Sequence, residues 1–129
     1  MTNLRCKKLV NENHSSIDLQ KPTNQKLPLV VSLPHSGREY SQEFLSQTCL
    51  NSLEIRRSED AFVDEIFAET STFGIPYLCA LFPRALIDPN RAEWELDSDM
   101  FIGEIANFRH IKSKMTKAGF GMIPRCVAT

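Results

Sequence analysis

Short apolar runs separated by polar stretches follow one another along this chain, and their spacing predicts several strands. The run at residues 27–33 predicts a strand that ends at Pro34. Residues 76–82 predict a second strand, and the alternating residues 84–88 predict a short third one. Near the end of the chain, residues 118–127 predict a turn that leads into a strand.

Helices are predicted between the first two strands. Residues 41–53 contain short helical pieces, and a longer helix is predicted from Ser58, a favourable N-cap, to about Thr72. Gly74 ends this pattern, as glycine often does just after a helix. The apolar stripe of the longer helix consists of Phe62, Val63, Ile66 and Phe67. Strand, helix and strand in this order predict an α/β fold, in which a mixed or parallel sheet carries flanking helices.

The chain divides into a polar N-terminal arm, residues 1–26, and one domain, residues 27–129. The arm has no sustained apolar period, so we expect an extension with at most a short helix or strand near Leu9 and Val10. Inside the domain, residues 92–110 predict a loop.

The composition, with 42% hydrophobic and 24% charged residues, is ordinary for a soluble globular protein. The formal net charge of −1 gives no electrostatic basis for binding nucleic acid or an anionic membrane. No apolar segment is long enough to cross a bilayer, and the charged N-terminus lacks the apolar stretch of a secretory signal. We therefore expect a cytoplasmic protein without nucleic-acid or membrane partners.

The four cysteines are scattered and form no C-x-x-C pair, which argues against a zinc ribbon or a thioredoxin-like motif. They are Cys6, Cys49, Cys79 and Cys126. We expect all four thiols to be reduced in the cytoplasm, and Cys79, inside an apolar run, to be buried.

His35 directly follows the first predicted strand and opens a Ser-Gly turn. Open α/β sheets bind ligands at the carboxyl ends of their strands, and a neutral imidazole is a common zinc ligand. The position therefore indicates a metal ligand. The alternative is a histidine that only forms a hydrogen bond in a turn.

Acidic residues follow Ser58 at the start of the longer predicted helix. A carboxylate at Glu59 or Asp60 could belong to a site or simply interact with the helix dipole. Asp60 and Asp64 are one helical turn apart, so both would face one cleft or one solvated surface.

Residues 83–91 place Arg84, Asp88, Asn90 and Arg91 around a short apolar stretch. Guanidinium groups bind carboxylates in two-pronged fashion, and Asn adds directional donors. The alternative is a turn, typical of Asp-Pro-Asn, with structural ion pairs to the aspartate.

Together these three clusters indicate a metal held by histidine and carboxylate beside an arginine-lined pocket. That arrangement suits the hydrolysis of an amide in an acidic substrate. The metal would polarise the carbonyl group and lower the pKa of a bound water. The arginines would hold the substrate and stabilise the developing oxyanion.

Three segments, in order and spacing, resemble the N-formylglutamate amidohydrolase family. They are Leu-Pro-His35-Ser-Gly-Arg, Arg57-Ser-Glu-Asp60-Ala-Phe-Val-Asp-Glu-Ile-Phe and Pro-Arg84-Ala-Leu-Ile-Asp88-Pro-Asn90-Arg91. The likeness runs from about Leu27 to the end of the sequence. It implies a zinc-carboxypeptidase-like (phosphorylase/hydrolase-like) α/β fold and hydrolysis of N-formyl-L-glutamate, or a related N-acyl amino acid, to formate and the amino acid.

The resemblance also implies roles for individual residues. The zinc ligands would be His35 and Asp60, with Asp60 preferred to Glu59 and Asp64. The residues that bind a small acidic N-acyl amino acid would be Arg84, Asn90 and Arg91, and Asp88 would orient the two arginines.

Members of the family are longer, and their second half should supply a further histidine ligand and the general acid/base. The other histidines of this chain, His14 and His110, lie in no such motif, so no general base is identified. A catalytic zinc normally needs three protein ligands. We therefore expect the N-terminal part of a truncated or split reading frame, with an incomplete sheet, uncovered apolar surface and a complementing C-terminal fragment as partner.

The sequence is consistent with three functional interpretations. The first is an amidohydrolase of this family, whose activity as a lone chain is in question. The second is a non-catalytic carboxylate-binding fragment or one half of a split enzyme. The third is an unstable fragment without function.

Overall fold

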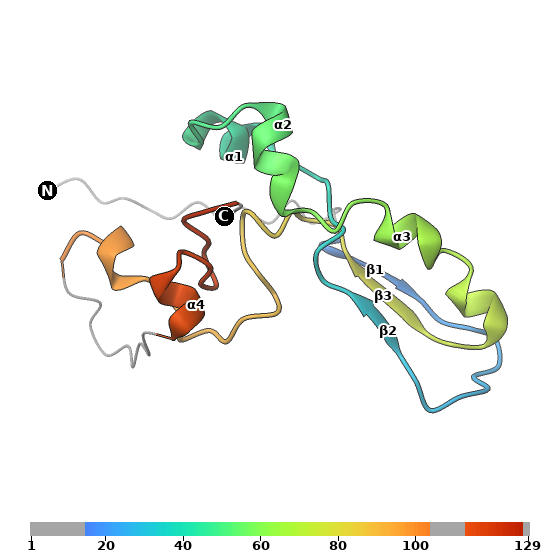
Figure 1. Cartoon of the computed structure of the whole chain (residues 1–129). Helices are drawn as coiled ribbons and strands as arrows, with labels where there is room; N and C mark the ends of the chain where they lie inside the picture. Colours follow the sequence, from blue (N-terminus) through green and yellow to red (C-terminus); the bar gives the residue numbers. More distant parts are fainter. Residues whose placement is uncertain (1–14, 104–112, 128–129) are drawn as a thin grey trace, which may run out of the picture.

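A computed structural model describes residues 15–103 and 113–127 of the chain (Figure 1). One side of the molecule contains a three-stranded sheet in the order β1-β3-β2 (Figure 1). The strands are β1 (Ile17–Gln20), β2 (Val31–Leu33) and β3 (Tyr77–Ala80). β3 pairs in parallel with β2 and antiparallel with β1. The predicted α/β class with a parallel pair is therefore confirmed, and β2 and β3 fall inside the two predicted apolar runs.

β1 lies in the arm, where the sequence predicted an extension with at most a short helix or strand near Leu9 and Val10, and no strand at residues 17–20. Its register pairs Ile17 with Ala80 and Gln20 with Tyr77. Four alternating residues are too short a pattern to indicate a strand by themselves, and the pairing with β3 is what stabilises them. Leu9 and Val10, the predicted site of a short element, lie outside the described residues.

Two short helices, α1 (Gln42–Gln47) and α2 (Ser52–Ile55), occupy the region in which helical pieces were predicted. Ser41 caps α1, because its hydroxyl accepts the Phe44 N–H. Asn51 caps α2 in a capping box with Glu54. Both helices therefore begin directly after a polar residue whose side chain caps the first turn.

The single long helix predicted from Ser58 to Thr72 is wrong. The chain instead forms a 3-10 helix (Arg56–Ser58), the one-turn α3 (Val63–Ile66) and a second 3-10 helix (Thr70–Phe73). The break occurs at Asp60, whose N–H donates to the His35 carbonyl oxygen at 3.0 Å instead of to a helical partner. Phe62 then adopts a left-handed backbone with φ of 64°. Gly74 does end the region, with φ of 81°.

The predicted strand at residues 84–88 is also wrong. The Leu86 N–H donates to the Pro83 carbonyl and the Arg91 N–H donates to the Asp88 carbonyl, so this segment folds as turns. The Asp-Pro-Asn sequence favours such turns over an extended strand.

The end of the described chain contains no strand either. The 3-10 helix Ser98–Met100 and the one-turn α4 (Lys114–Lys117) are its regular elements. Within residues 118–127, the Arg125 and Cys126 N–H groups both donate to the Gly119 carbonyl, and these bonds curl the chain back. Of the predicted loop 92–110, the part beyond residue 103 lies outside the described residues.

One face of the sheet carries the buried core cluster of Leu33, Tyr77 and Cys79, against which Val31 and Val63 pack. Cys79 is 4% exposed, as predicted. Cys49, Cys79 and Cys126 are free thiols, and Cys6 lies outside the described residues. No described helix has both the length and the apolar character needed to cross a membrane.

Candidate functional site

His35 lies just beyond the end of β2 and is buried, with 8% of its surface exposed. The turn that carries it packs tightly against the end of β3. A Cβ atom on Gly37 would lie 2.0 Å from the Phe82 carbonyl oxygen, so only glycine fits there. The structure thus places the His35 imidazole at the carboxyl end of β2, which pairs in parallel with β3, as the sequence predicted.

The His35 ring lies between two carboxylates. Its Nε2 is 2.8 Å from Oδ1 of Asp88, and its Nδ1 is 3.4 Å from Oδ2 of Asp60. The Asp88 side chain is 2% exposed, whereas that of Asp60 is 52% exposed. The predicted approach of His35 and Asp60 is therefore present in the structure, with Asp60 on the open side of the ring.

Asp60 is held beside His35 by its backbone. Its N–H donates to the His35 carbonyl, and its own carbonyl accepts the Ser36 hydroxyl at 3.1 Å. Both bonds join Asp60 to the turn after β2. Its carboxylate therefore stays near the His35 ring although about half of the side chain is exposed to solvent. These same bonds prevent the helix that the sequence pattern predicted.

Asp88 gathers several donors around one buried carboxylate. Oδ2 accepts from Arg84 Nη2 at 2.7 Å, and Oδ1 accepts the Asn90 N–H at 2.9 Å. Burial by itself would raise the pKa of Asp88, but the bonds to His35 and Asn90 and the Arg84 charge outweigh it and hold that pKa below its ordinary value. Sequence reasoning linked Asp88 to the arginines and missed its contact with His35.

A cavity of about 320 Å³ opens beside these residues. Its lining includes Arg57, Asp60, Arg84, Asp88 and Cys126. No motif pointed to Cys126, because only the turn at Gly119 brings it to the cavity.

The two other predicted substrate-binding residues do not line this cavity. Asn90 is exposed, and its backbone N–H rather than its side chain contacts Asp88. The Nε atom of Arg91 is buried without a hydrogen-bond partner and lies 3.9 Å from Oδ2 of Asp88. Of the three, the structure brings Arg84 to the cavity.

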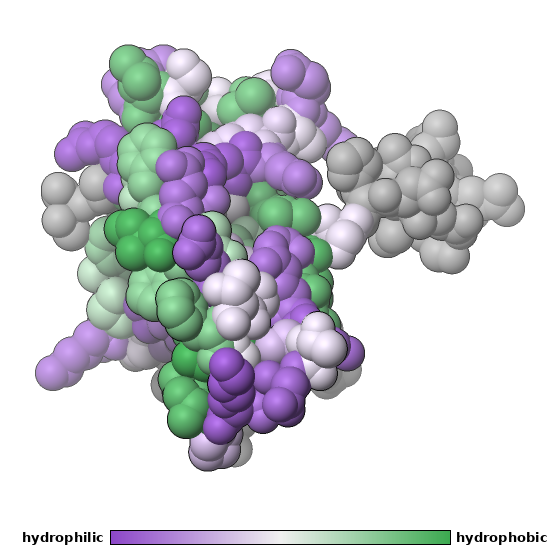
Figure 2. Space-filling model, turned by 90° about the vertical axis from the view of Figure 1, so that its right-hand side faces the viewer, coloured by the Kyte–Doolittle hydropathy of each residue, from purple (hydrophilic) through white to green (hydrophobic). Residues whose placement is uncertain are grey.

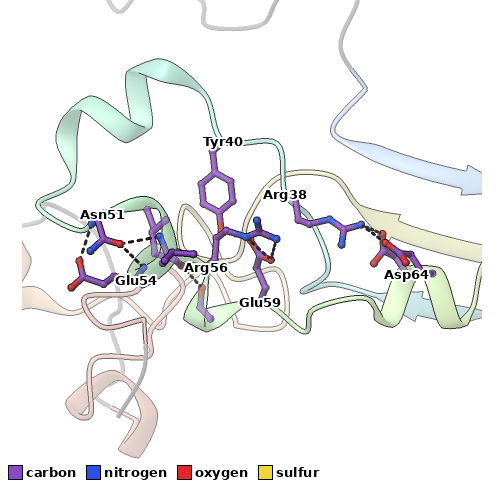
Figure 3. A network of polar contacts seen from close by, with 11 residues as sticks. Arg38, Tyr40, Asn51, Glu54, Arg56, Glu59 and Asp64 are labelled. Atoms are coloured by element: carbon purple, nitrogen blue, oxygen red, sulfur yellow. Dashed lines mark hydrogen bonds and ion pairs between the residues drawn. The ribbon is translucent and has the colours of Figure 1, made fainter.

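Glu59, which also lines the cavity, and Asp64 form hydrogen bonds with residues other than His35. The Glu59 side chain, 2% exposed, accepts from Tyr40 Oη at 2.8 Å and from Arg56 Nε at 3.0 Å, as Figure 3 shows. Asp64 accepts from Arg38 (Figure 3). Of the three acidic residues Glu59, Asp60 and Asp64, Asp60 is the one whose carboxylate contacts the His35 ring.

The pair of His35 and Asp60 offers donor types that zinc uses, one imidazole nitrogen and one carboxylate oxygen. A ligating histidine usually donates its other N–H to a carboxylate, and Asp88 occupies that position on Nε2. The described residues contain no group of three His, Cys, Asp or Glu that could hold a metal ion. His14 and His110 lie outside the described residues. The residues present thus fit two ligand positions.

The sequence profile of the N-formylglutamate amidohydrolase family, FGase, matches residues 27–129 of this chain. A comparison with curated proteins gives no match. The crystal structure of N-formylglutamate amidohydrolase from Ralstonia eutropha JMP134 superposes with a TM-score of 0.78 at 31% sequence identity. The match covers 87% of this chain and 39% of that chain, so this chain spans well under half of the neighbour's length. This chain therefore belongs to the N-formylglutamate amidohydrolase family.

Proposed function

We propose that this chain serves in the metal-dependent hydrolysis of the amide bond of N-formyl-L-glutamate or a related N-acyl amino acid. The observation that carries the proposal is the His35 ring between Asp60 and buried Asp88, next to a cavity lined by Arg84. Membership of the family and the Ralstonia neighbour support it. We also propose that the complete domain has a carboxypeptidase-like fold and acts in the cytoplasm.

Zinc is the metal we propose, and His35 Nδ1 and Asp60 Oδ2 are the groups that would hold it. When bound, such an ion polarises a carbonyl group and lowers the pKa of a water molecule. Asp88 acts on the histidine from the opposite side. With the Nε2–H donated to Asp88, the free lone pair of Nδ1 faces Asp60, which is the tautomer that a ligand needs.

The substrate's carboxylate groups would be held by guanidinium. Arg84 reaches the cavity, and its bond to Asp88 fixes its direction while other N–H groups stay available. Arg91 contributes further positive charge, since its Nε lies 3.9 Å from Oδ2 of Asp88. We also propose Asn90 as a substrate contact, because it is exposed and lies in the turn between Asp88 and Arg91. A cavity of about 320 Å³ suits a molecule of the size of an acyl amino acid.

A second candidate function is supported by a different observation. The match covers 39% of the neighbouring chain, and the described residues provide two metal donors where a catalytic zinc needs three. This favours a carboxylate-binding fragment, or one half of a split enzyme that works with a complementing C-terminal polypeptide.

The test measures zinc content, glutamate binding and formate release with the purified chain. We expect zinc binding to be lost in His35→Ala and Asp60→Asn but kept in Asp64→Asn, the matched control. Arg84→Ala should weaken glutamate binding at least tenfold, whereas Lys21→Ala, which removes an exposed charge outside the cavity lining, should not. Zinc-dependent formate release supports hydrolysis, and glutamate binding without release supports the second candidate. A chain that binds neither zinc nor glutamate would contradict both.

A further inference from the structure

Arg57 differs from the other arginines of the described chain in its partners. Hydrophilic residues are common on the surface, including the side of the molecule that carries the sheet (Figure 2), so the exposure of a charged residue is by itself ordinary. However, no hydrogen bond or ion pair joins the Arg57 side chain to another described residue. The other described arginines each have a nitrogen atom at most 3.9 Å from a carboxylate oxygen; they are Arg38, Arg56, Arg84, Arg91 and Arg125.

Arg57 also lines the cavity of the candidate site. It lies in the 3-10 helix Arg56–Ser58, which directly follows α2. Three residues complete one turn of such a helix, so neighbouring side chains leave it in different directions. Arg56 donates from Nε to Glu59 at 3.0 Å, whereas Arg57 is exposed at the cavity. The two adjacent arginines therefore have different surroundings.

The acidic residues of the cavity lining do not compete for Arg57, because each of them already faces another group. The pairs are Glu59 with Arg56, Asp60 with His35, and Asp88 with Arg84. Among the described residues, Arg57 is thus the charged lining residue whose charge no other side chain balances. An anion that enters the cavity would find this guanidinium group available.

The proposed substrate carries two carboxylates, one on the α-carbon and one at the end of the glutamate side chain. A guanidinium group binds one carboxylate through two parallel hydrogen bonds, so two carboxylates call for two such groups. Without a cationic partner, the second carboxylate would lose water in the cavity without compensation. Arg84 and Arg57 both line this one cavity.

We propose that Arg57 binds the side-chain carboxylate of the substrate, with Arg84 on the α-carboxylate, and thereby gives the site its preference for N-acyl derivatives of dicarboxylic amino acids over those of neutral ones. This inference rests on the proposed function, because it assumes that an N-acyl amino acid occupies the cavity. It adds a specificity-determining residue that no sequence motif indicated.

The experiment compares the binding of N-formyl-L-glutamate and N-formyl-L-glutamine to the full chain by calorimetry. The two compounds have nearly the same shape, and an amide replaces the side-chain carboxylate in the second. We expect the chain to bind N-formyl-L-glutamate about tenfold more tightly, and Arg57→Gln to abolish this preference by weakening the binding of N-formyl-L-glutamate alone. Lys21→Gln is the matched control, since it removes an exposed positive charge outside the cavity lining and should leave the preference unchanged.

Thermal melting checks that Arg57→Gln is folded. Arg57→Lys, which keeps the charge but not the two-pronged geometry, should give an intermediate preference and provides the test if the first variant does not fold. The inference is overturned if Arg57→Gln keeps the full preference, or if it weakens the binding of both compounds equally. In either case the proposed function stands as long as Arg84→Ala weakens the binding of both compounds. A chain that binds neither compound would contradict the proposed function and this inference together.

Discussion

Asp88 lies buried among partners that are themselves candidate site residues. A carboxylate that is 2% exposed has lost nearly all its water, and its charge is tolerated because His35, Arg84 and the Asn90 N–H face it. The same contacts orient the imidazole and the guanidinium. Stability and the geometry of the site therefore depend on one side chain.

Replacing Asp88 with Asn is expected to lower the free energy of unfolding by about 3 kcal/mol, because Arg84 loses its charged partner in a buried setting. Urea denaturation followed by circular dichroism measures this difference. Glu93→Gln changes an exposed carboxylate a few residues away and should alter the free energy by less than about 0.5 kcal/mol. Equal effects of the two substitutions would contradict the central role of Asp88.

The free energy of unfolding should depend on pH through the ionisation of Tyr40. Burial, followed by its hydrogen bond to Glu59, raises the pKa of Tyr40 above its ordinary value of 10.0. Above pH 10 the unfolded chain loses this proton while the folded chain keeps it, so the stability that Tyr40 contributes is complete below pH 10 and falls as pH rises. Denaturant titrations between pH 8 and 11 should show this decline, and Tyr40→Phe should make it shallower. The pKa of Tyr77 is also raised, so part of the decline should remain. An unchanged slope in Tyr40→Phe would exclude this role.

At the scale of the elements, the turn after β2 has no room for a side chain at Gly37. Gly37 packs against the backbone at Leu81 and Phe82, and this close approach brings the end of β2 to the end of β3. Backbone atoms cannot move aside as the end of a flexible side chain can. The position of His35 therefore depends on a residue without a Cβ atom.

Gly37→Ala is expected to lower the free energy of unfolding by about 1–3 kcal/mol through overpacking. Gly103→Ala shows the cost of backbone strain without crowding, because Gly103 has φ of 92°, which strains alanine, but nothing lies within 4 Å of an added Cβ. Thermal melts of both variants measure the comparison. We expect Gly37→Ala to melt at the lower temperature, and the reverse order would contradict the close packing at this turn.

In the molecule as a whole, the sheet is organised around β3, the central strand, which pairs with both neighbours. Its residues Tyr77, Cys79 and Ala80 are buried. By contrast, α4 is one turn of helix in which only Thr116 is buried. The two elements should therefore differ in how readily they open.

Amide hydrogen exchange measured by NMR should be slowest in Tyr77–Ala80 and clearly faster in Lys114–Lys117. Exchange in β3 requires the sheet to open, whereas α4 can unfold locally at small cost. Protection of α4 equal to that of β3 would contradict a sheet-centred fold.

The amino-acid sequence by itself predicted two of the three strands and three of the side chains that meet at the candidate site. The apolar runs predicted β2 and β3, and the motifs around His35, Asp60 and Arg84 predicted three side chains that the structure brings close together. These signals are local: apolar runs, caps and residue types that bind carboxylates or metals. The tertiary structure alone decided the rest. Asp60 leaves its predicted helix because its backbone bonds to the turn at His35, β1 exists because β3 offers it a partner, and Asp88 meets His35 across 53 positions of sequence. Such contacts join segments that are far apart in the sequence. Patterns among neighbouring residues therefore cannot predict them.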